Sequence, residues 1–426
     1  MEFKQYPSYK PSGVEWLGDV PEHWQIVRTK DIFNHRKEEA LEDDEIVTAF
    51  RDGQVTLRKN RRTDGFTNSI KEHGYQHINN GDLVIHEMDA FAGAIGVSDS
   101  SGKSTPVYTV CYAKNENINH HFYSHFFRTM AKTGFINSLA KGIRVRSTEF
   151  RWNESRNVYL VEPPKADQEK IVSFLDTETA RIDNLIAKQE KLIELLEEQR
   201  KSIISHAVTK GLNPNAPMKD SGVEWLGEVP EDWEVKRFGY IFTENKKKNI
   251  GLIETNVLSL SYGNIKEKNI DDNKGLLPES FETYQIIEPN DIVFRFTDLQ
   301  NDKRSLRNAI SKYHGIITSA YIGVKTKENA DFYNYLFRAY DLQKVFYSMG
   351  DGMRQSLKMD ELNKMPIVLP KIEAQERIVK FINEENQRIN NLVVKQKNLI
   401  EKLKEYRASI ISHAVTGKID VREFGA

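Results

Sequence analysis

Two stretches of the sequence are rich in side chains that bind nucleic acids. The first is a glycine-punctuated segment that carries Arg51, Gln54, Arg58, Arg61 and Arg62. The second is longer and carries Lys246, Lys248, Tyr262, Lys266, Arg295, Arg304 and Arg307. Arginine can bind guanine O6 and N7, glutamine can pair with adenine, and lysine holds phosphate. We predict that both stretches contact DNA, the first as strand, turn and strand; for any single side chain, a solvated charged surface is the alternative.

A second pair of segments places arginine beside a flexible backbone. Gly142-Ile-Arg-Val-Arg-Ser and Gly352-Met-Arg-Gln-Ser occur at matching places in the two halves of the chain. Glycine permits a close approach of the backbone, and a neighbouring arginine suits a phosphate or a base edge. We therefore add four residues to the predicted DNA-binding set: Arg144, Arg146, Arg354 and Gln355. Structural arginines bound to local carbonyl groups are the alternative.

Motif fragments for catalysis fail on their context. Gly102-Lys103-Ser104-Thr105 resembles the end of a phosphate-binding loop, but Pro106 follows where a helix should begin. A nuclease could be assembled from Asp82, Glu87 and Lys103, or from Asp291, Asp298 and Lys303. Such sets arise by chance in a chain that is 29% charged. Aspartates at strand ends are more often turn residues. The sequence therefore predicts neither a catalytic constellation nor a metal site.

The elements that would position these side chains include a long helix that occurs twice. The segment 168–209, which begins QEKIVSFLDTETARID, returns without a gap at 375–416 as QERIVKFINEENQRIN. Asp167 is the predicted cap of the first copy, and Gly211 and Gly417 follow the two predicted ends. A helix from Gln168 to His206 would be about 58 Å long. We interpret each copy as a rigid spacer.

Apolar residues on alternating three- and four-residue steps indicate a coiled coil. A seam this narrow needs a partner helix, and the other copy is the nearest candidate. Polar residues interrupt the seam at Glu178 and Gln189 and at the matching Glu385 and Gln396, which would fix the register. For Glu178 and Glu385, a place near the frayed helix starts is the alternative. The predicted central seam consists of Ile182, Leu185, Leu192, Leu196, Ile389, Leu392, Leu399 and Leu403.

The helix belongs to a larger duplication, because SGVEWLGDVPEHWQIVRTKDIF (12–33) reappears as SGVEWLGEVPEDWEVKRFGYIF (221–242). Residues 43–76 and 244–286 show almost no resemblance, so a shared frame carries divergent inserts. Short β-type runs and helical patterns at 120–133 and 331–348 predict α+β domains. The predicted division is a first domain, 1–165; a first helix, 166–212; a second domain, 213–372; and a second helix with its tail, 373–426. The repeated tryptophans near the domain starts suggest a core clamp.

Composition narrows the class of protein. The chain has 426 residues, a formal net charge of -1 and one cysteine, Cys111. It is therefore no polycation, and any basic surface must be local. A thiolate zinc site within one chain is excluded. Since the sequence shows neither a signal-like apolar run nor a membrane span, we expect a soluble cytoplasmic protein.

The sequence resembles the specificity subunits of type I restriction-modification enzymes over nearly its whole length. The resemblance is carried by the doubled Glu-Trp-Leu-Gly-Asp/Glu-Val-Pro-Glu-x-Trp opening and the Gly-x-Arg segments. It is also carried by the Ala-Asp-Gln-Glu (166–169) and Glu-Ala-Gln-Glu (373–376) helix starts and the repeated Ser-Ile-Ile-Ser-His-Ala-Val-Thr helix ends. The resemblance implies two target-recognition domains, separated by an antiparallel coiled coil of conserved helices with pseudo-two-fold symmetry.

The resemblance also implies a function without catalysis. Each domain would read one half of a bipartite, asymmetric site on double-stranded DNA, and the helix pair would set the unread gap. Two modification (methyltransferase) subunits and two restriction (motor-nuclease) subunits would be partners, and S-adenosylmethionine, ATP and magnesium would belong to them. The alternatives are a coiled-coil scaffold that binds proteins, and a single-chain endonuclease with a hidden acidic site. Steep salt dependence of DNA binding would argue against the scaffold.

Overall fold

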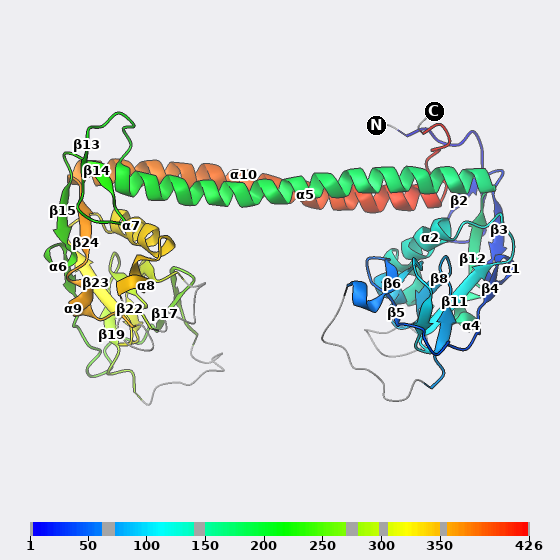
Figure 1. Ribbon diagram of the computed structural model, residues 1–426, viewed down its shortest axis with the longest axis horizontal. Coiled ribbons are helices and arrows are strands. Elements are labelled where there is room, and N and C mark those ends of the chain that lie inside the picture. The colour runs from blue at the N-terminus through cyan, green and yellow to red at the C-terminus, as the bar shows by residue number, and fades with distance from the viewer. Residues whose placement is uncertain are drawn as a thin grey trace. The chain divides into compact units, whose positions relative to one another are not determined.

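The computed structural model describes residues 3–61, 73–139, 150–269, 280–297, 306–349 and 356–424 (Figure 1). The chain forms two compact units. The first unit consists of Met1–Gln189 and Asn398–Ala426, and the second of Glu190–Lys397. Each unit contains an α+β domain and parts of both long helices, so the boundary between the units falls inside the helices. None of the described helices is long and apolar enough to cross a membrane.

The domain of the first unit is built from short elements. In chain order they are β1 (Tyr9–Pro11), β2 (Asp19–Pro21), β3 (Gln25–Arg28), α1 (Thr29–Ile32), β4 (Phe33–His35), β5 (Val47–Ala49), β6 (Val55–Leu57), η1 (Arg58–Asn60), β7 (Gln76–Ile78), β8 (Leu83–His86), η2 (Ala90–Ala92), β9 (Ile95–Val97), β10 (Gly102–Ser104), β11 (Tyr108–Ala113), α2 (His120–Lys132), α3 (Phe135–Ser138), α4 (Trp152–Ser155) and β12 (Tyr159–Glu162).

The domain of the second unit repeats this order with small differences. Its elements are β13 (Met218–Asp220), β14 (Glu228–Pro230), β15 (Glu234–Arg237), α6 (Phe238–Ile241), β16 (Phe242–Glu244), β17 (Leu258–Ser261), β18 (Asn264–Glu267), β19 (Gln285–Ile287), β20 (Ile292–Phe294), β21 (Asn308–Ile310), β22 (Gly315–Ile317), β23 (Ile322–Thr326), α7 (Ala330–Leu342), α8 (Val345–Met349), α9 (Met359–Leu362) and β24 (Pro366–Leu369). The helix predicted over 331–348 is thus divided, with Lys344 at a φ of 63° between the two parts.

A four-stranded antiparallel sheet lies at the centre of each domain. The strand order is β4-β11-β8-β9 in the first and β16-β23-β20-β21 in the second. Alternate residues of a strand face opposite sides of its sheet. Leu83 and Ile85 accordingly belong to the core that contains α2, whereas Val84 packs with the β5–β6 hairpin. Each sheet therefore supports a helix on one face and a hairpin on the other.

A long helix follows each domain in sequence: α5 (Lys165–Lys210) follows the first and α10 (Ile372–Val415) follows the second. Gly211 and Gly417 follow them with φ values of 78° and 71°, so the predicted helix ends are confirmed. The predicted cap was wrong. Because α5 starts two residues before Asp167, this carboxylate lies in the first turn, where its Oδ2 is 2.8 Å from His23 Nε2 and accepts a bond from buried Trp24 Nε1 at 3.4 Å.

A buried glutamine ties each helix start to its domain. Gln168 Oε1 accepts from the backbone N–H of Asn119, the cap of α2, at 2.9 Å, and its Nε2 donates to the Pro163 carbonyl at 2.8 Å. Gln375 repeats both bonds with Asn329, the cap of α7, and Pro370, at 3.1 and 2.8 Å. The repeated Gln-Glu of the two helix starts therefore has a structural cause.

The long helices pack against each other within each unit (Figure 1). The first unit holds the start of α5 and the end of α10, so the two run antiparallel there. In this unit Arg407 Nη2 donates to Asp183 Oδ2 at 3.1 Å. In the second unit the equivalent Arg200 Nη2 donates to Asn390 Oδ1 at 2.7 Å. Polar contacts thus accompany the apolar seam in both units.

The predicted seam is correct at some positions and wrong at others. Ile182, Leu196 and Ile389 are buried, and Leu185, Leu392 and Leu403 are partly buried. Leu192 and Leu399 are instead 39% and 41% exposed. The α5 sequence Leu-Ile-Glu-Leu-Leu offers apolar residues on neighbouring faces, and the structure packs Ile193 and Leu196 rather than Leu192. Ile400 similarly replaces Leu399 in the buried set.

Candidate nucleic-acid interface

The first basic segment includes the turn and second strand of the β5–β6 hairpin. The predicted strand, turn and strand is only partly correct, because β5 ends before Arg51 and Arg58 begins η1 after β6. Thr48 pairs with Thr56 in antiparallel register, and the backbone N–H of Phe50 donates to the Gln54 carbonyl at 2.8 Å to close the turn. Gly53 has a φ of 94°, which a residue with a side chain rarely adopts. This turn presents exposed Arg51 and Gln54 on either side of Asp52 and Gly53.

The basic residues of this hairpin are held by local contacts. Arg51 Nη2 lies 2.9 Å from Asp89 Oδ1, and Arg61 Nη1 lies 2.7 Å from Asp52 Oδ2 with its guanidinium 4.2 Å from the centre of the Phe50 ring. Arg58 Nε donates to Thr48 Oγ1 at 3.3 Å. Surface ion pairs of this kind contribute little to stability, so a phosphate can replace the carboxylates at small cost.

The second unit presents an equivalent hairpin, β17–β18, with different side chains. Tyr262 occupies its tip with a φ of 48° and is 74% exposed. Gly263 follows, also in the left-handed region, and Lys266 projects as an exposed residue of β18. A bulky residue at positive φ is strained, so its retention at an exposed tip points to a use for the ring.

Other predicted residues of the second unit lie around this hairpin or away from the surface. Lys246 and Lys248 are exposed in the loop after β16, and Arg295 is half-buried just after β20. Arg307 was predicted to bind DNA, but its side chain is 0% exposed. Its backbone N–H donates to Asp341 Oδ2 at 3.0 Å and its guanidinium lies over the Tyr347 ring. A guanidinium with no surface cannot reach a base, so Arg307 is a core residue.

Six of the predicted DNA-binding residues lie outside the residues that the structure describes. They are Arg62, Arg144, Arg146, Arg304, Arg354 and Gln355.

The sequence did not predict a role for two arginines that contact the hairpin tips from α7 and α2. Arg338 of α7 donates from Nη2 to the carbonyl oxygen of Gly263. Arg128, at the matching position of α2, lies so close to Gly53 that a Cβ on that glycine would overlap its guanidinium. Burial lowers the pKa of both arginines. The matched segments FYSHFFR and FYNYLFR were a signal for these positions, but each hairpin lies about 75 residues away in sequence.

Close backbone packing joins the first hairpin to the rest of its domain. A Cβ at Gly96 would overlap the Gly53 carbonyl, and a Cβ at Gly102 would overlap the Glu45 carbonyl. The segment that resembled a phosphate-binding loop is strand β10, in which Gly102 pairs with Ile78 of β7. These glycines therefore serve hairpin packing.

The acidic residues weighed as nuclease ligands have structural roles. Asp82 Oδ2 accepts from the Asn79 N–H at 2.8 Å, and Asp291 Oδ2 accepts from the Glu288 N–H at 2.9 Å, as turn residues do. Asp82 also receives Arg36 Nε at 2.7 Å. Burial raises the pKa of Asp291. Within the described ranges, no group of three or more His, Cys, Asp or Glu side chains could hold a metal ion.

Comparison with known proteins finds similar chains and a matching family model. Residues 21–195 match the family model described as the type I restriction modification DNA specificity domain. The putative type I restriction enzyme MjaX specificity subunit of Methanocaldococcus jannaschii is 22% identical over 431 residues, which cover 95% of this chain and 96% of the relative. The match to the family model includes the first hairpin, the sheet of the first domain and about two thirds of α5.

Solved structures show the same fold over nearly the whole chain. The HsdS subunit from Thermoanaerobacter tengcongensis is similar with a TM-score of 0.55 and 14% identity, covering 94% of this chain and 98% of that one. A chain from a structural study of complex assembly and conformational transition of the type I restriction-modification system is similar with a TM-score of 0.62 and 14% identity. That match covers 93% of this chain and 98% of the other.

Proposed function

Because residues 21–195 match the type I restriction modification DNA specificity domain, we propose that the chain selects the DNA site on which such a complex acts. Each domain reads one half of a bipartite, asymmetric site. The observation that carries this proposal is the pair of hairpins: the two domains repeat one scaffold, yet Arg51 and Gln54 stand at one tip and Tyr262 at the other. A repeated frame with unlike exposed tips suits the reading of two unlike sequences.

The helix pair sets the number of unread base pairs in this proposal. α5 has 46 residues, which corresponds to about 69 Å of helix, and buried apolar residues join it to α10. Such a pair resists bending and changes of length. The chain itself has no catalytic role; S-adenosylmethionine, ATP and magnesium are bound by partner subunits.

The partners are two methyltransferase subunits and two motor-nuclease subunits, together with double-stranded DNA, and they act in the cytoplasm. Apolar residues that the helix pair leaves exposed support docking of a subunit there. In the second unit these residues are Leu192, Leu195 and Val394, and in the first they are Leu399 and Tyr406. Two of these, Leu192 and Leu399, occupy the same position of the helix repeat, which suits two copies of one partner.

The test is selection of binders from a pool of randomised duplexes, using the full chain purified with its methyltransferase. Two short, unlike motifs at a fixed gap are expected. Exchange of residues 1–165 for the corresponding block of a relative should then change one motif and preserve both the other motif and the gap. Recovery of no enriched sequence by the intact complex would refute the proposal and favour a protein-binding scaffold. Magnesium-dependent cutting by the chain alone would favour the endonuclease.

A further inference from the structure

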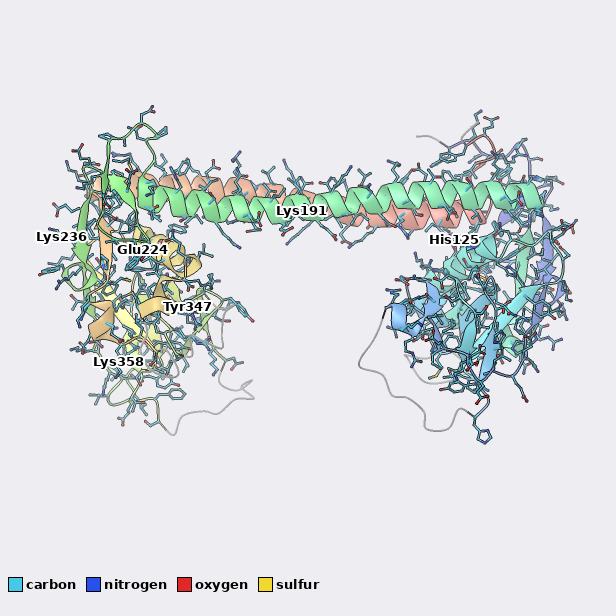
Figure 2. All side chains as sticks on the ribbon, viewed as in Figure 1. His125, Lys191, Glu224, Lys236, Tyr347 and Lys358 are labelled. Carbon is cyan, nitrogen blue, oxygen red and sulfur yellow. The ribbon has the colours of Figure 1, made fainter. Side chains whose placement is uncertain are left out.

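A small cavity in the first unit lies between α2 and the last turns of α10. Its volume is about 100 Å³. Figure 2 shows His125 on α2, on the side toward α10. The lining comes from one face of α2 and its end, and from the facing turns of α10. The lining residues are His125, Arg128, Thr129, Lys132, Thr133, Ala408, Ile411 and Ser412.

Polar atoms of this lining lack partners. Thr129 is 2% exposed, and its hydroxyl makes no hydrogen bond within the described part of the chain. The same holds for buried His125 Nδ1 and Arg128 Nε. Buried polar groups in folded proteins are almost always hydrogen-bonded. The cavity therefore offers hydrogen-bonding groups from three residues to a ligand.

The cavity is also positively charged. Arg128 and Lys132 form no ion pair with any carboxylate among the residues described, and Arg407 lies nearby with Asp183 as its partner. Burial is the main cause that lowers the pKa of Lys132, and the positive charges of Arg128 and Arg407 lower it further. Burial is the main cause that lowers the pKa of His125 to about 3. The charges of Arg128, His121, Arg407 and Lys132 contribute to the same lowering. The pKa of Arg128 is lowered by burial and by Arg407, whereas the negative charge of Asp52 raises it. An anion would relieve this mutual repulsion.

The second unit provides an internal comparison, because α7 repeats α2. There Tyr335 replaces His125, Ala339 replaces Thr129 and Leu342 replaces Lys132, while the arginine is kept as Arg338. The Tyr335 hydroxyl donates to Asn383 Oδ1 at 2.8 Å, so this position is bonded to the neighbouring helix. Among the described residues, the Nε of Arg338 lacks a partner, as that of Arg128 does, but the unpartnered imidazole nitrogen and threonine hydroxyl have no counterpart in the second unit and are no requirement of the fold.

We propose that this cavity binds a single phosphate group, either free or part of a DNA backbone. Two cationic side chains and a threonine hydroxyl match the charge and the acceptor oxygens of a phosphate. An imidazole beside a phosphate can take up a proton and become a second donor. The free-ion form of the site is independent of the proposed function, whereas the DNA form rests on it.

The experiment measures the melting temperature of the full chain in inorganic phosphate and in chloride at equal ionic strength. The key variant is His125→Tyr/Thr129→Ala/Lys132→Leu, which introduces the residues of the second unit. If the triple variant does not fold, Lys132→Leu alone replaces it. The control for the lost charge is Lys402→Leu, at an exposed site of α10 where the other copy of the repeat has Leu195. Phosphate should stabilise the chain and Lys402→Leu equally, with affinity for phosphate at least tenfold weaker in the triple variant.

Two further outcomes distinguish the source of the phosphate. If inorganic phosphate competes with duplex binding, and the triple variant has a salt slope of log K smaller by about one, the group belongs to DNA. If phosphate stabilises the chain without competition, it binds as a free ion. Equal phosphate stabilisation of the chain and the triple variant, or no stabilisation together with an unchanged salt slope, would overturn the site. A phosphate-stabilised chain that selects no duplex would keep the site and refute the proposed function.

Discussion

The guanidinium of Arg338 donates to the carbonyl oxygen of Gly263, which joins α7 to the tip of the β17–β18 hairpin. Arg128 reaches the tip of the other hairpin, at Gly53, from the same position of the repeat. Each proposed DNA-reading tip is therefore supported by a residue that is itself mostly buried. A substitution at either arginine should act on the tip of its own unit.

We expect Arg338→Met to destabilise the second unit by about 2 kcal/mol, because the Gly263 carbonyl loses a bond to a charged donor. Loss of selectivity should be confined to one half-site, and Arg128→Met should affect the other. Calorimetry and half-site competition measure the two effects. Arg388→Met, which removes an exposed pair with Glu385 on α10, is the control. Equal loss of selectivity at both half-sites in either variant would contradict the role assigned to these arginines.

The tip residue Tyr262 allows stability and binding to be separated. Tyr262→Gly removes the ring but suits the positive φ, so the second unit should be as stable as before or more stable by up to about 1 kcal/mol. Affinity for the cognate duplex should fall roughly tenfold if the ring packs on a base edge or a thymine methyl in the groove. Thermal melting and gel-shift titration check both numbers. An unchanged affinity would remove Tyr262 from the interface.

Gln375 should be among the most sensitive positions of α10. Gln375→Leu leaves the Asn329 N–H and the Pro370 carbonyl buried without this partner, which should cost about 3 kcal/mol in the free energy of unfolding. Gln168→Leu should do the same in the first unit. Gln387→Leu, at an exposed position of the same helix, is the matched control. Similar melting temperatures for the Gln375 and Gln387 variants would show that the buried bonds are dispensable.

The helix seam predicts a contrast between two apolar residues. Ile389 is 1% exposed and packs with Leu196, so Ile389→Ala should cost about 2–4 kcal/mol. Leu192→Ala should cost less than about 1 kcal/mol in the isolated chain, yet weaken association with the methyltransferase. Denaturant unfolding and co-purification measure these effects. A cost at Leu192 as large as the cost at Ile389 would restore the seam predicted from the sequence, which contained both residues.

Acid should destabilise the first unit through His125. Its pKa in the folded chain is about 3, below the ordinary 6.5. The stability contributed by the neutral ring is present above pH 6.5 and is lost as the pH falls from 6.5 toward 3, by up to about 1.4 kcal/mol per pH unit. In phosphate-free buffer, His125→Gln should therefore lose less stability than the parent between pH 7 and 5. Exposed His413→Gln should behave like the parent.

The duplication made much of the fold predictable. The repeated opening, the closing strands and the two helices could be located because the same pattern occurs twice, and buried Trp24 and Trp233 confirm the predicted core clamp. The seam was harder, since apolar residues at 192, 193, 195 and 196 fit more than one helical face. Only the packing of α5 against α10 shows which of these residues are buried.

The candidate site was less predictable, because charge alone does not reveal burial. Arg307 and Arg51 are both arginines that the sequence predicts to contact DNA, but Asp341 and Tyr347 surround the first, whereas the second is exposed. The support of Gly53 by Arg128 and of Gly263 by Arg338 depends on tertiary contacts between residues about 75 positions apart. No local pattern contains that information.

The boundary between the compact units has a consequence for inheritance. It falls after Gln189 in α5 and after Lys397 in α10, which are within one residue of the same position of the helix repeat. The second unit is thus one continuous stretch of gene flanked by similar sequences. Crossing-over at these two places would transfer a whole unit with its own helix packing intact. One genetic event would therefore produce a new combination of half-sites, and the buried residues of the transferred unit would keep their packing partners.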